Sequence, residues 1–293
     1  MKIKLTILFI FIHIISLKTQ NNVELNTILM NSVYKIEGKS MDDPTKIVRG
    51  TGFIIGKRDS DTSQMALIVL VTAKHVLDDI GGEFAYLKLR YKNTDTSYNE
   101  FVQQIRIRNE NEKCWYIDED QSIDIAALPI SLPEKFLEYF GNYFLSDELL
   151  ATDSAISLLE LHPGDEVFSI GFPLGIGSNY FGFPLLRSGK IASYPLLPTS
   201  TYKTMLIDMN VFEGNSGSPV YICENSRIIQ NNKIVFEVIA ILGVLTTSIK
   251  QISYIEYQNM SIEEKIPLGL GGVVPSSYLL KILQKIETDT DIK

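Results

Sequence analysis

Hydrophobic and polar positions after residue 20 form many short runs of strand length. Apolar or alternating runs of this kind predict β-strands over 47–55, 65–72, 84–91, 101–108, 123–128, 166–172, 185–192, 204–209, 219–223 and 234–245. Helical periodicity is scarce, and the helix that we expect covers 276–286, with Ser276 as its N-cap after Pro275. Many short antiparallel strands with few helices are typical of an all-β sandwich or barrel.

Two polar segments divide this pattern. Residues 146–157 read as a link between two halves of similar size, so we expect one unit over 21–150 and a second over 151–293. Residues 250–265 form a polar insertion, which predicts a loop. This insertion holds the triplet Asn259-Met-Ser261, which is a glycosylation sequon only in a host that glycosylates.

Residues 1–20 differ from the rest of the chain. Lys2 and Lys4 give a basic start, and residues 5–17 are almost wholly apolar, a run shorter than the roughly 20 residues of a spanning helix. This pattern predicts a secretory signal peptide and therefore a secreted or periplasmic protein. No small-x-small triplet precedes Asn21, so an uncleaved N-terminal anchor is the alternative.

The charge of the chain restricts its partners. The whole sequence carries a formal charge of −8, and removal of residues 1–20 takes away three lysines, which gives 24 − 35 = −11. So acidic a surface argues against nucleic acid and against anionic membranes as partners. We expect no stable membrane insertion once the signal peptide is cleaved.

Cys114 and Cys223 can pair in an exported protein, or both can be free thiols. Two cysteines alone cannot form a structural zinc site, and no metal or other cofactor is expected.

Candidate chemistry begins with the histidines, because His75 and His162 are the two that remain after residue 20. His75 follows an apolar strand, in Leu-Val-Thr-Ala-Lys-His-Val-Leu over 70–77. His162 precedes Pro-Gly in a turn, where a histidine is usually just exposed. His75 is therefore the candidate general base.

The segment Gly214-Asn-Ser-Gly-Ser-Pro219 offers a nucleophile. A serine hydroxyl attacks only when a base removes its proton and donors stabilise the oxyanion. The flanking glycines allow backbone conformations that aim the amides of Gly214 and Ser216 at one point, which would form an oxyanion hole. Taken alone, the segment reads equally well as an ordinary turn.

Asp124 lies in Ser-Ile-Asp-Ile-Ala-Ala-Leu over 122–128, an apolar run. A buried carboxylate there would need a partner, and a histidine N–H would serve. The alternative is a strand edge that faces water, a reading that fits the neighbouring Asp118, Glu119 and Asp120 better.

Together these segments resemble the trypsin-like serine peptidases, in the order His, Asp, Ser and over nearly all of the chain after residue 20. The matching motifs are Gly-Thr-Gly-Phe-Ile at 50–54, Val-Thr-Ala-Lys-His-Val at 71–76 and Asp-Ile-Ala-Ala-Leu at 124–128. Segments that resemble the HtrA-like branch lie at 164–175, 188–193, 207–216 and 271–276.

The resemblance implies two perpendicular six-stranded antiparallel β-barrels and a C-terminal helix, with His75 and Asp124 on the first barrel and Ser216 on the second. It implies a serine endopeptidase that acts on polypeptides, with Ser216 as nucleophile, His75 as general base and Asp124 as orienting carboxylate. Asn210 would form the floor of the primary pocket. Thr246 and Thr247 would pair with the substrate backbone as an added strand.

The sequence also departs from the family. Asn215 replaces the aspartate that pairs with a new N-terminal ammonium in digestive enzymes, so we expect no such activation. Ser218 stands where HtrA-like enzymes have a second glycine, and this version resembles secreted glutamyl endopeptidases. Leu245 stands where those enzymes have a histidine, so glutamate specificity is not expected. Because Asn210 is no carboxylate either, we expect a small or medium apolar side chain in the pocket.

Alternative readings remain open at this stage. The chain can be a catalytically silent binding module of the same fold, or a membrane-tethered quality-control protease; no PDZ-like segment follows the second half, and the oligomeric state is open. The absence of a cysteine from 214–219 excludes a cysteine nucleophile there. A Ser–Lys dyad with Lys74 is disfavoured, because on a strand Lys74 would point away from the side of His75.

Overall fold

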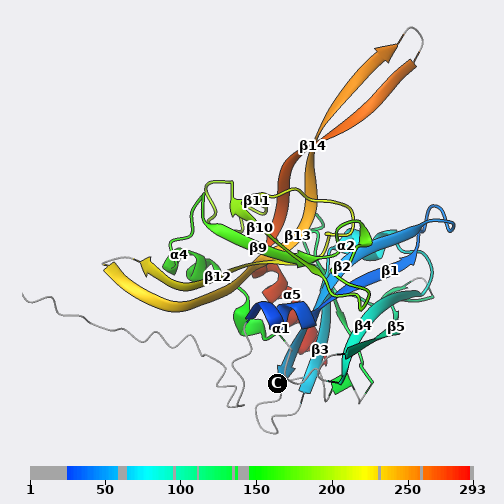
Figure 1. Cartoon of the computed structure of the whole chain (residues 1–293), viewed down its shortest axis with the longest axis horizontal. Coiled ribbons are helices and arrows are strands. Elements are labelled where there is room, and N and C mark those ends of the chain that lie inside the picture. Colours follow the sequence, from blue (N-terminus) through cyan, green and yellow to red (C-terminus); the bar gives the residue numbers. More distant parts are fainter. Residues whose placement is uncertain are drawn as a thin grey trace, which may run out of the picture.

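The structure is a computed structural model and describes residues 25–58, 65–94, 97–110, 112–133, 136–137, 145–229, 232–257 and 260–290. Its described elements are mostly strands, with few helices (Figure 1). The expected all-β class is confirmed.

The strands of the first half form one six-stranded sheet in the order β5-β4-β1-β2-β3-β8. Alternating side chains of these strands pack into a core that includes Tyr34, Ile54 and Leu87, because burial removes their apolar surface from water. The elements of this half are α1 (Leu25–Ser32), β1 (Val33–Lys39), β2 (Ile47–Arg58), β3 (Met65–Thr72), α2 (Lys74–Asp79), β4 (Phe84–Thr94), β5 (Ser97–Arg106), β6 (Arg108–Asn109), β7 (Glu112–Lys113) and β8 (Ala126–Pro129).

The second half is a closed six-stranded barrel in the order β10-β11-β14-β13-β12-β9. Its core includes Ile207, Val220 and Leu242. The elements of this half are η1 (Asp147–Leu149), α4 (Asp153–Leu158), β9 (Glu166–Gly171), η2 (Pro173–Gly175), β10 (Leu185–Ile191), β11 (Met205–Asp208), β12 (Ser218–Ile229), β13 (Lys233–Tyr257), β14 (Met260–Pro275) and α5 (Ser276–Thr290).

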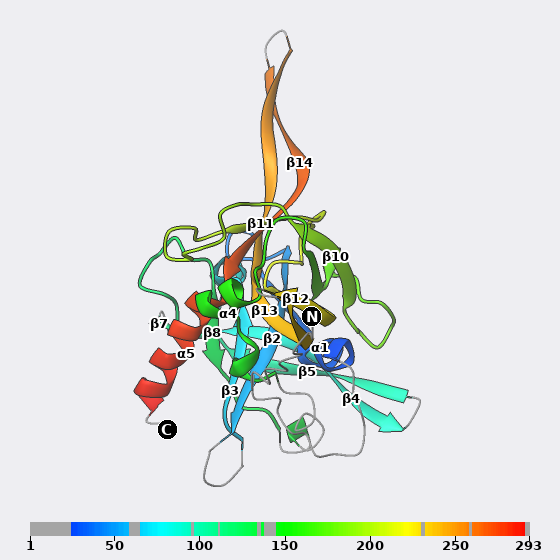
Figure 2. The same ribbon diagram turned by 90° about the vertical axis from the view of Figure 1, so that its left-hand side faces the viewer.

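A third apolar cluster joins the halves. It contains Phe53 and Val71 from the first sheet, Ile170 and Tyr221 from the barrel, and Leu279 from α5. Side chains from distant parts of the sequence are buried together there, so the two halves are held against each other rather than only linked by the chain. Figure 2 shows α5 along one side of this body.

The expectation of a loop over residues 250–265 is wrong. There β13 and β14 continue as an antiparallel ladder from Lys250↔Pro267 to Tyr257↔Met260, and this ribbon projects from the barrel (Figures 1 and 2). The ladder extends pairing that begins inside the barrel, so backbone hydrogen bonds hold it where the side chains are polar. Asn259, the sequon residue, lies outside the described residues.

Several local expectations also need correction. His75 lies in the short helix α2, not on a strand, and Asp124 precedes β8 instead of lying within a strand. Ser276 is the first residue of α5, and its hydroxyl donates to the carbonyl of Ile241 at 2.6 Å. The link expected at 146–157 holds η1 and most of α4, and the unforeseen strand β1 lies at the centre of the first sheet.

The cysteines do not form a disulfide with each other in the structure. Cys114 packs against the core of the first sheet, whereas Cys223 lies on β12. Residues 1–20, the expected signal peptide, lie outside the described residues. Among the residues that are described, no helix has the length and apolar character to cross a membrane.

Candidate active site

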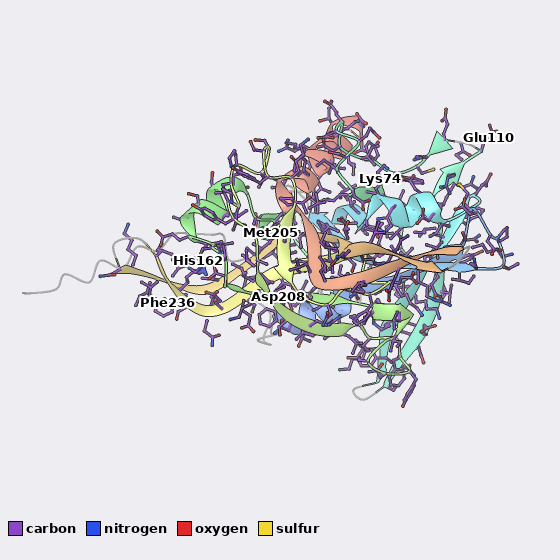
Figure 3. The ribbon with its side chains drawn as sticks, turned by 90° about the horizontal axis from the view of Figure 1, so that it is seen from above. Lys74, Glu110, His162, Met205, Asp208 and Phe236 are labelled. Atoms are coloured by element: carbon purple, nitrogen blue, oxygen red, sulfur yellow. The ribbon has the colours of Figure 1, made fainter. Side chains whose placement is uncertain are left out.

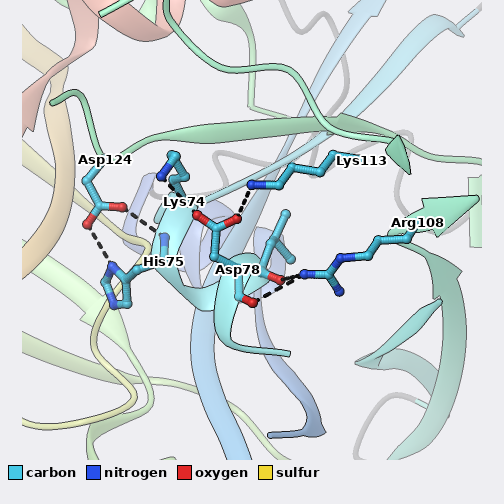
Figure 4. Close-up of polar contacts among 7 residues, drawn as sticks. Lys74, His75, Asp78, Arg108, Lys113 and Asp124 are labelled. Carbon is cyan, nitrogen blue, oxygen red and sulfur yellow. Dashed lines mark hydrogen bonds and ion pairs between the residues drawn. The ribbon is translucent and has the colours of Figure 1, made fainter. Parts of the chain in front are cut away.

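His75 and Asp124 are joined by two hydrogen bonds, although they are far apart in the sequence (Figure 4). Asp124 Oδ2 lies 2.7 Å from His75 Nδ1, and Asp124 Oδ1 accepts from the His75 backbone amide at 2.9 Å. With Asp124 ionised, the neutral imidazole carries its proton on Nδ1 and leaves Nε2 as an acceptor. The carboxylate therefore fixes both the position and the tautomer of the ring.

The surroundings of His75 change its proton affinity. Burial lowers the pKa of the imidazole, but the hydrogen bond and the negative charge of Asp124 raise it, with smaller contributions from Asp79 and Asp78. The net result is a pKa above the ordinary 6.5. The pair thus stabilises the imidazolium, the form that a general base takes after it has accepted a proton.

Arg108 holds the end of the helix that carries His75. Its buried guanidinium donates to the backbone carbonyls of Leu77, Asp78, Ile80 and Gly82 at distances from 2.5 to 3.2 Å. These include carbonyls at the C-terminal end of α2, which lack partners inside the helix. Sequence reasoning missed Arg108, because nothing local in an arginine at the end of a strand shows that it reaches another element.

Lys74 and Lys113 form ion pairs with Asp78 on the outer side of α2 (Figure 4). The Lys74 ammonium lies 2.9 Å from the Asp78 carboxylate, one helical turn away. Lys74 therefore already has a carboxylate partner. This contact weakens the reading of Lys74 as the base of a Ser–Lys dyad.

The segment that carries Ser216 is a tight turn between β11 and β12. Gly214 and Gly217 have positive φ values of 89° and 92°, a region that favours glycine. A Cβ on Gly217 would lie 1.9 Å from the carbonyl oxygen of Thr51, so no larger residue fits without movement. Within the described part of the chain, no backbone carbonyl accepts a hydrogen bond from the amide of Gly214 or Ser216.

Thr51 on β2 ties this turn to the first half of the molecule. Its backbone amide donates to the Ser216 carbonyl at 2.8 Å, and its hydroxyl donates to the Gly214 carbonyl at 2.6 Å. The same hydroxyl accepts from the Phe172 amide at 3.1 Å. Thr51 is fully buried, so these bonds link the sheet that positions His75 with the barrel that carries Ser216.

The Ser216 hydroxyl donates to the Thr246 carbonyl at 3.3 Å. The structure describes both Ser216 and His75, and no hydrogen bond joins the Ser216 hydroxyl to the His75 ring. The structure thus brings His75 to Asp124, and it leaves Ser216 in the turn before β12 with its hydroxyl bonded to β13. Hydrogen bonds of a catalytic site often tighten only when a substrate is bound.

Comparison with known families shows to which family the chain belongs. Residues 50–229 match the trypsin-like peptidase domain, and this span contains His75, Asp124 and Ser216. The chain belongs to this family. No curated protein matches the chain significantly.

Solved structures of proteases resemble the trypsin-like chain at low identity. The Rv3671c protease from M. tuberculosis, in its active form, is 18% identical, with 89% of this chain and 83% of that chain covered and a TM-score of 0.44. The protease Anisep from Arthrobacter nicotinovorans is 14% identical, with 87% and 94% covered and a TM-score of 0.48. The thermostable serine protease AL20 from an extremophilic microorganism is 10% identical, with 87% and 99% covered and a TM-score of 0.46.

The remaining predicted site residues lie on two segments, β13 and the residues just after β11. Thr246 is buried on β13, and the next residue, Thr247, is exposed and pairs with Gly272 of β14. Asn210 is exposed just after β11. Its Oδ1 lies 3.3 Å from where a Cβ on Gly269 would stand, which places Asn210 beside β14.

His162 is not part of this constellation. Figure 3 shows it well away from Lys74, the neighbour of His75. Its backbone amide donates to Asp165 at 2.9 Å, and its side chain is largely exposed. Across the described ranges of the chain, no group of three or more His, Cys, Asp or Glu side chains is placed to hold a metal ion.

Proposed function

We propose that the chain is a serine endopeptidase in which Ser216, His75 and Asp124 act as a triad. The observation that carries this proposal is the pair of hydrogen bonds from Asp124 to His75, at 2.7 and 2.9 Å. These bonds leave Nε2 of the imidazole able to act as a base. In a domain of the trypsin-like family, Thr51 hydrogen-bonds to the segment that carries Ser216 and so connects that segment with the sheet of the first half.

The reaction divides into two transfers. His75 Nε2 takes the proton of the Ser216 hydroxyl while Oγ attacks the substrate carbonyl carbon, and the amides of Gly214 and Ser216 donate to the resulting oxyanion. The C–N bond then breaks, and the leaving amine takes the proton from His75. A water molecule hydrolyses the acyl-enzyme by the same steps, so the serine returns with its proton.

The oxyanion hole would form without a new N-terminal ammonium. Asn215 is buried, and its amide side chain offers no charge for such an ion pair. The turn is held instead by backbone bonds such as Asn215 N to Phe212 O at 3.1 Å and by Thr51. Substrates would lie along Thr246 and Thr247 as an added strand.

Export completes the proposal. A secreted or periplasmic location rests on the basic start and apolar run of residues 1–20. An N-terminal tether would give the same domain a membrane-bound setting. Intact mass of the protein recovered from its native host separates the two, since only export with cleavage removes this segment.

One observation favours a silent binding module as the second candidate. The Ser216 hydroxyl donates to Thr246 O and not to His75. A site that stays in this arrangement would bind polypeptides without cutting them.

Mass spectrometry of an unfolded protein substrate incubated with the purified protein separates these functions. We expect fragments with internal cleavage sites from the wild type and none from Ser216→Ala. Fragments that differ only by residues lost from an end would contradict the endopeptidase. Intact substrate that nonetheless binds the wild type would establish the silent module.

A further inference from the structure

Arg187 on β10 lies beside the segment that leads to Ser216. Its Nη1 donates to the backbone carbonyl of Asn210 at 2.6 Å. Its guanidinium carbon lies 5.2 Å from the centre of the Phe212 ring, a distance typical of a cation–π contact. These two contacts hold the half-buried arginine at the residue that we expect at the floor of the primary pocket.

Glycines of β14 pack closely beside this floor. Gly269 faces Asn210, and a Cβ on Gly271 would lie 2.8 Å from Val211 and 2.9 Å from Leu245. Gly272 pairs with Thr247, so this stretch of β14 runs beside both the floor and the strand proposed to bind substrate backbone. At the two points where β14 passes Asn210 and Thr247, Gly269 and Gly272 present backbone, whereas Val211 and Leu245 fill the space at Gly271.

The guanidinium of Arg187 retains hydrogen-bonding capacity. A guanidinium has five N–H donors, and the bond to Asn210 uses one of them. Arg108 gives its donors to four carbonyls, and Arg227 pairs with Asp165 and Glu224. By contrast, no carboxylate in the described part of the chain forms an ion pair with Arg187.

We propose that Arg187 binds an acidic side chain, Glu or Asp, of the substrate residue on the amino side of the scissile bond. The proposal rests on the endopeptidase function proposed above. A guanidinium held by Asn210 and Phe212 is pre-oriented for a carboxylate, which it can bind through two parallel N–H donors. The positive charge that reads the substrate comes from Arg187 on β10, not from the strand that carries Leu245. The proposed acidic preference replaces the apolar preference expected from the sequence.

Matched peptides that differ only in this one residue test the proposal. We expect the wild type to cleave the Glu peptide with a kcat/KM about 10- to 100-fold above that for the Gln and Leu peptides, the effect of a charge-assisted hydrogen bond. Arg187→Gln removes the positive charge but keeps an amide donor, and in this variant the ratio of kcat/KM for the Glu peptide to that for the Leu peptide should fall by about the same factor. Arg187→Glu should favour a Lys peptide.

Lys190→Ala is the matched control, because Lys190 lies three positions along β10 and is exposed on the other face of the strand. In Lys190→Ala, the ratio of kcat/KM for the Glu peptide to that for the Leu peptide should equal the wild-type ratio. A wild-type preference for Leu or Gln, or an unchanged ratio in Arg187→Gln, would overturn the proposal.

Labelling of Ser216 by a fluorophosphonate, measured on the same samples, separates this failure from a failure of the peptidase function. A protein that is labelled but shows no preference for acidic residues would contradict only the role of Arg187. A folded wild type that is never labelled would contradict the proposed endopeptidase function.

Discussion

At the residue scale, Asp124 determines how His75 responds to pH. The general base must be neutral to accept the serine proton, and the bond and charge of Asp124 overcome burial to raise the pKa of His75 above 6.5. Protonation therefore removes activity as the pH falls. We predict that kcat/KM rises with pH to a plateau, with its midpoint above pH 6.5. A profile that is flat from pH 5 to pH 8, a range spanning the usual histidine titration, would contradict this role.

Asp124→Asn should remove both the orientation and the charge. The expected result is a loss in kcat of about 10³- to 10⁴-fold, the typical effect of removing the orienting carboxylate of such a triad, with a lower pH midpoint. Asp120→Asn is the matched control, because Asp120 is paired with Lys203 at the surface. A steady-state pH series on both variants measures the difference. Equal losses in the two variants would argue against a specific role for Asp124.

Gly217 shows how backbone conformation restricts a single position. Gly217→Ala should lower the free energy of unfolding by about 3 kcal/mol, since the added Cβ meets the Thr51 carbonyl at a positive φ. Gly164→Ala carries a similar positive φ but meets nothing within 4 Å, so it should cost about 1 kcal/mol. Urea unfolding compares the two. Equal costs would show that the contact with Thr51 O contributes nothing.

At the element scale, α2 depends on Arg108. Arg108→Ala should lower the free energy of unfolding by about 3 kcal/mol, because buried carbonyls of Leu77 and Ile80 lose their donor. Arg106→Ala removes an exposed arginine two residues away and should change it by less than about 0.5 kcal/mol. Denaturant titration measures both variants. Similar small changes would mean that α2 holds without this contact.

The sequence predicts helices and strands correctly where a local pattern of residues determines them. The run at 65–72 became β3 because apolar side chains fill both faces of a buried strand. The extension of β13 beyond Lys250 was missed, because its polar residues read as a loop while pairing with β14 maintains the strand. The helix α2 was missed for a different reason: it has six residues, too few to show a helical period.

At the scale of the whole molecule, the proposed triad is assembled across two halves. The sequence predicts His75, Asp124 and Ser216 as the triad, because their motifs are local. It could not reveal Thr51 or Arg187 as neighbours of the Ser216 segment, because those contacts join residues far apart in the chain. The packing of the two halves creates the Thr51 contact, and the folding of the barrel brings Arg187 on β10 to Asn210 after β11.

Thr51→Val tests this assembly. The change keeps the shape of the side chain but leaves the Gly214 carbonyl and the Phe172 amide without the hydroxyl. We predict a fall in kcat/KM of about 10- to 100-fold and a loss of about 1–3 kcal/mol in stability. Thr45→Val, at an exposed hydroxyl that bonds to Asp43, should match the wild type. Wild-type activity in Thr51→Val would show that the turn is positioned by other contacts.

Covalent labelling with a fluorophosphonate tests the proposed triad most directly. We predict that the wild type gains one adduct, located on Ser216 by mass spectrometry of its peptides. Ser216→Ala should gain none, and His75→Ala should react far more slowly, because no base then activates the hydroxyl. A folded wild type that stays unlabelled, or that is labelled equally fast without His75, would contradict the account.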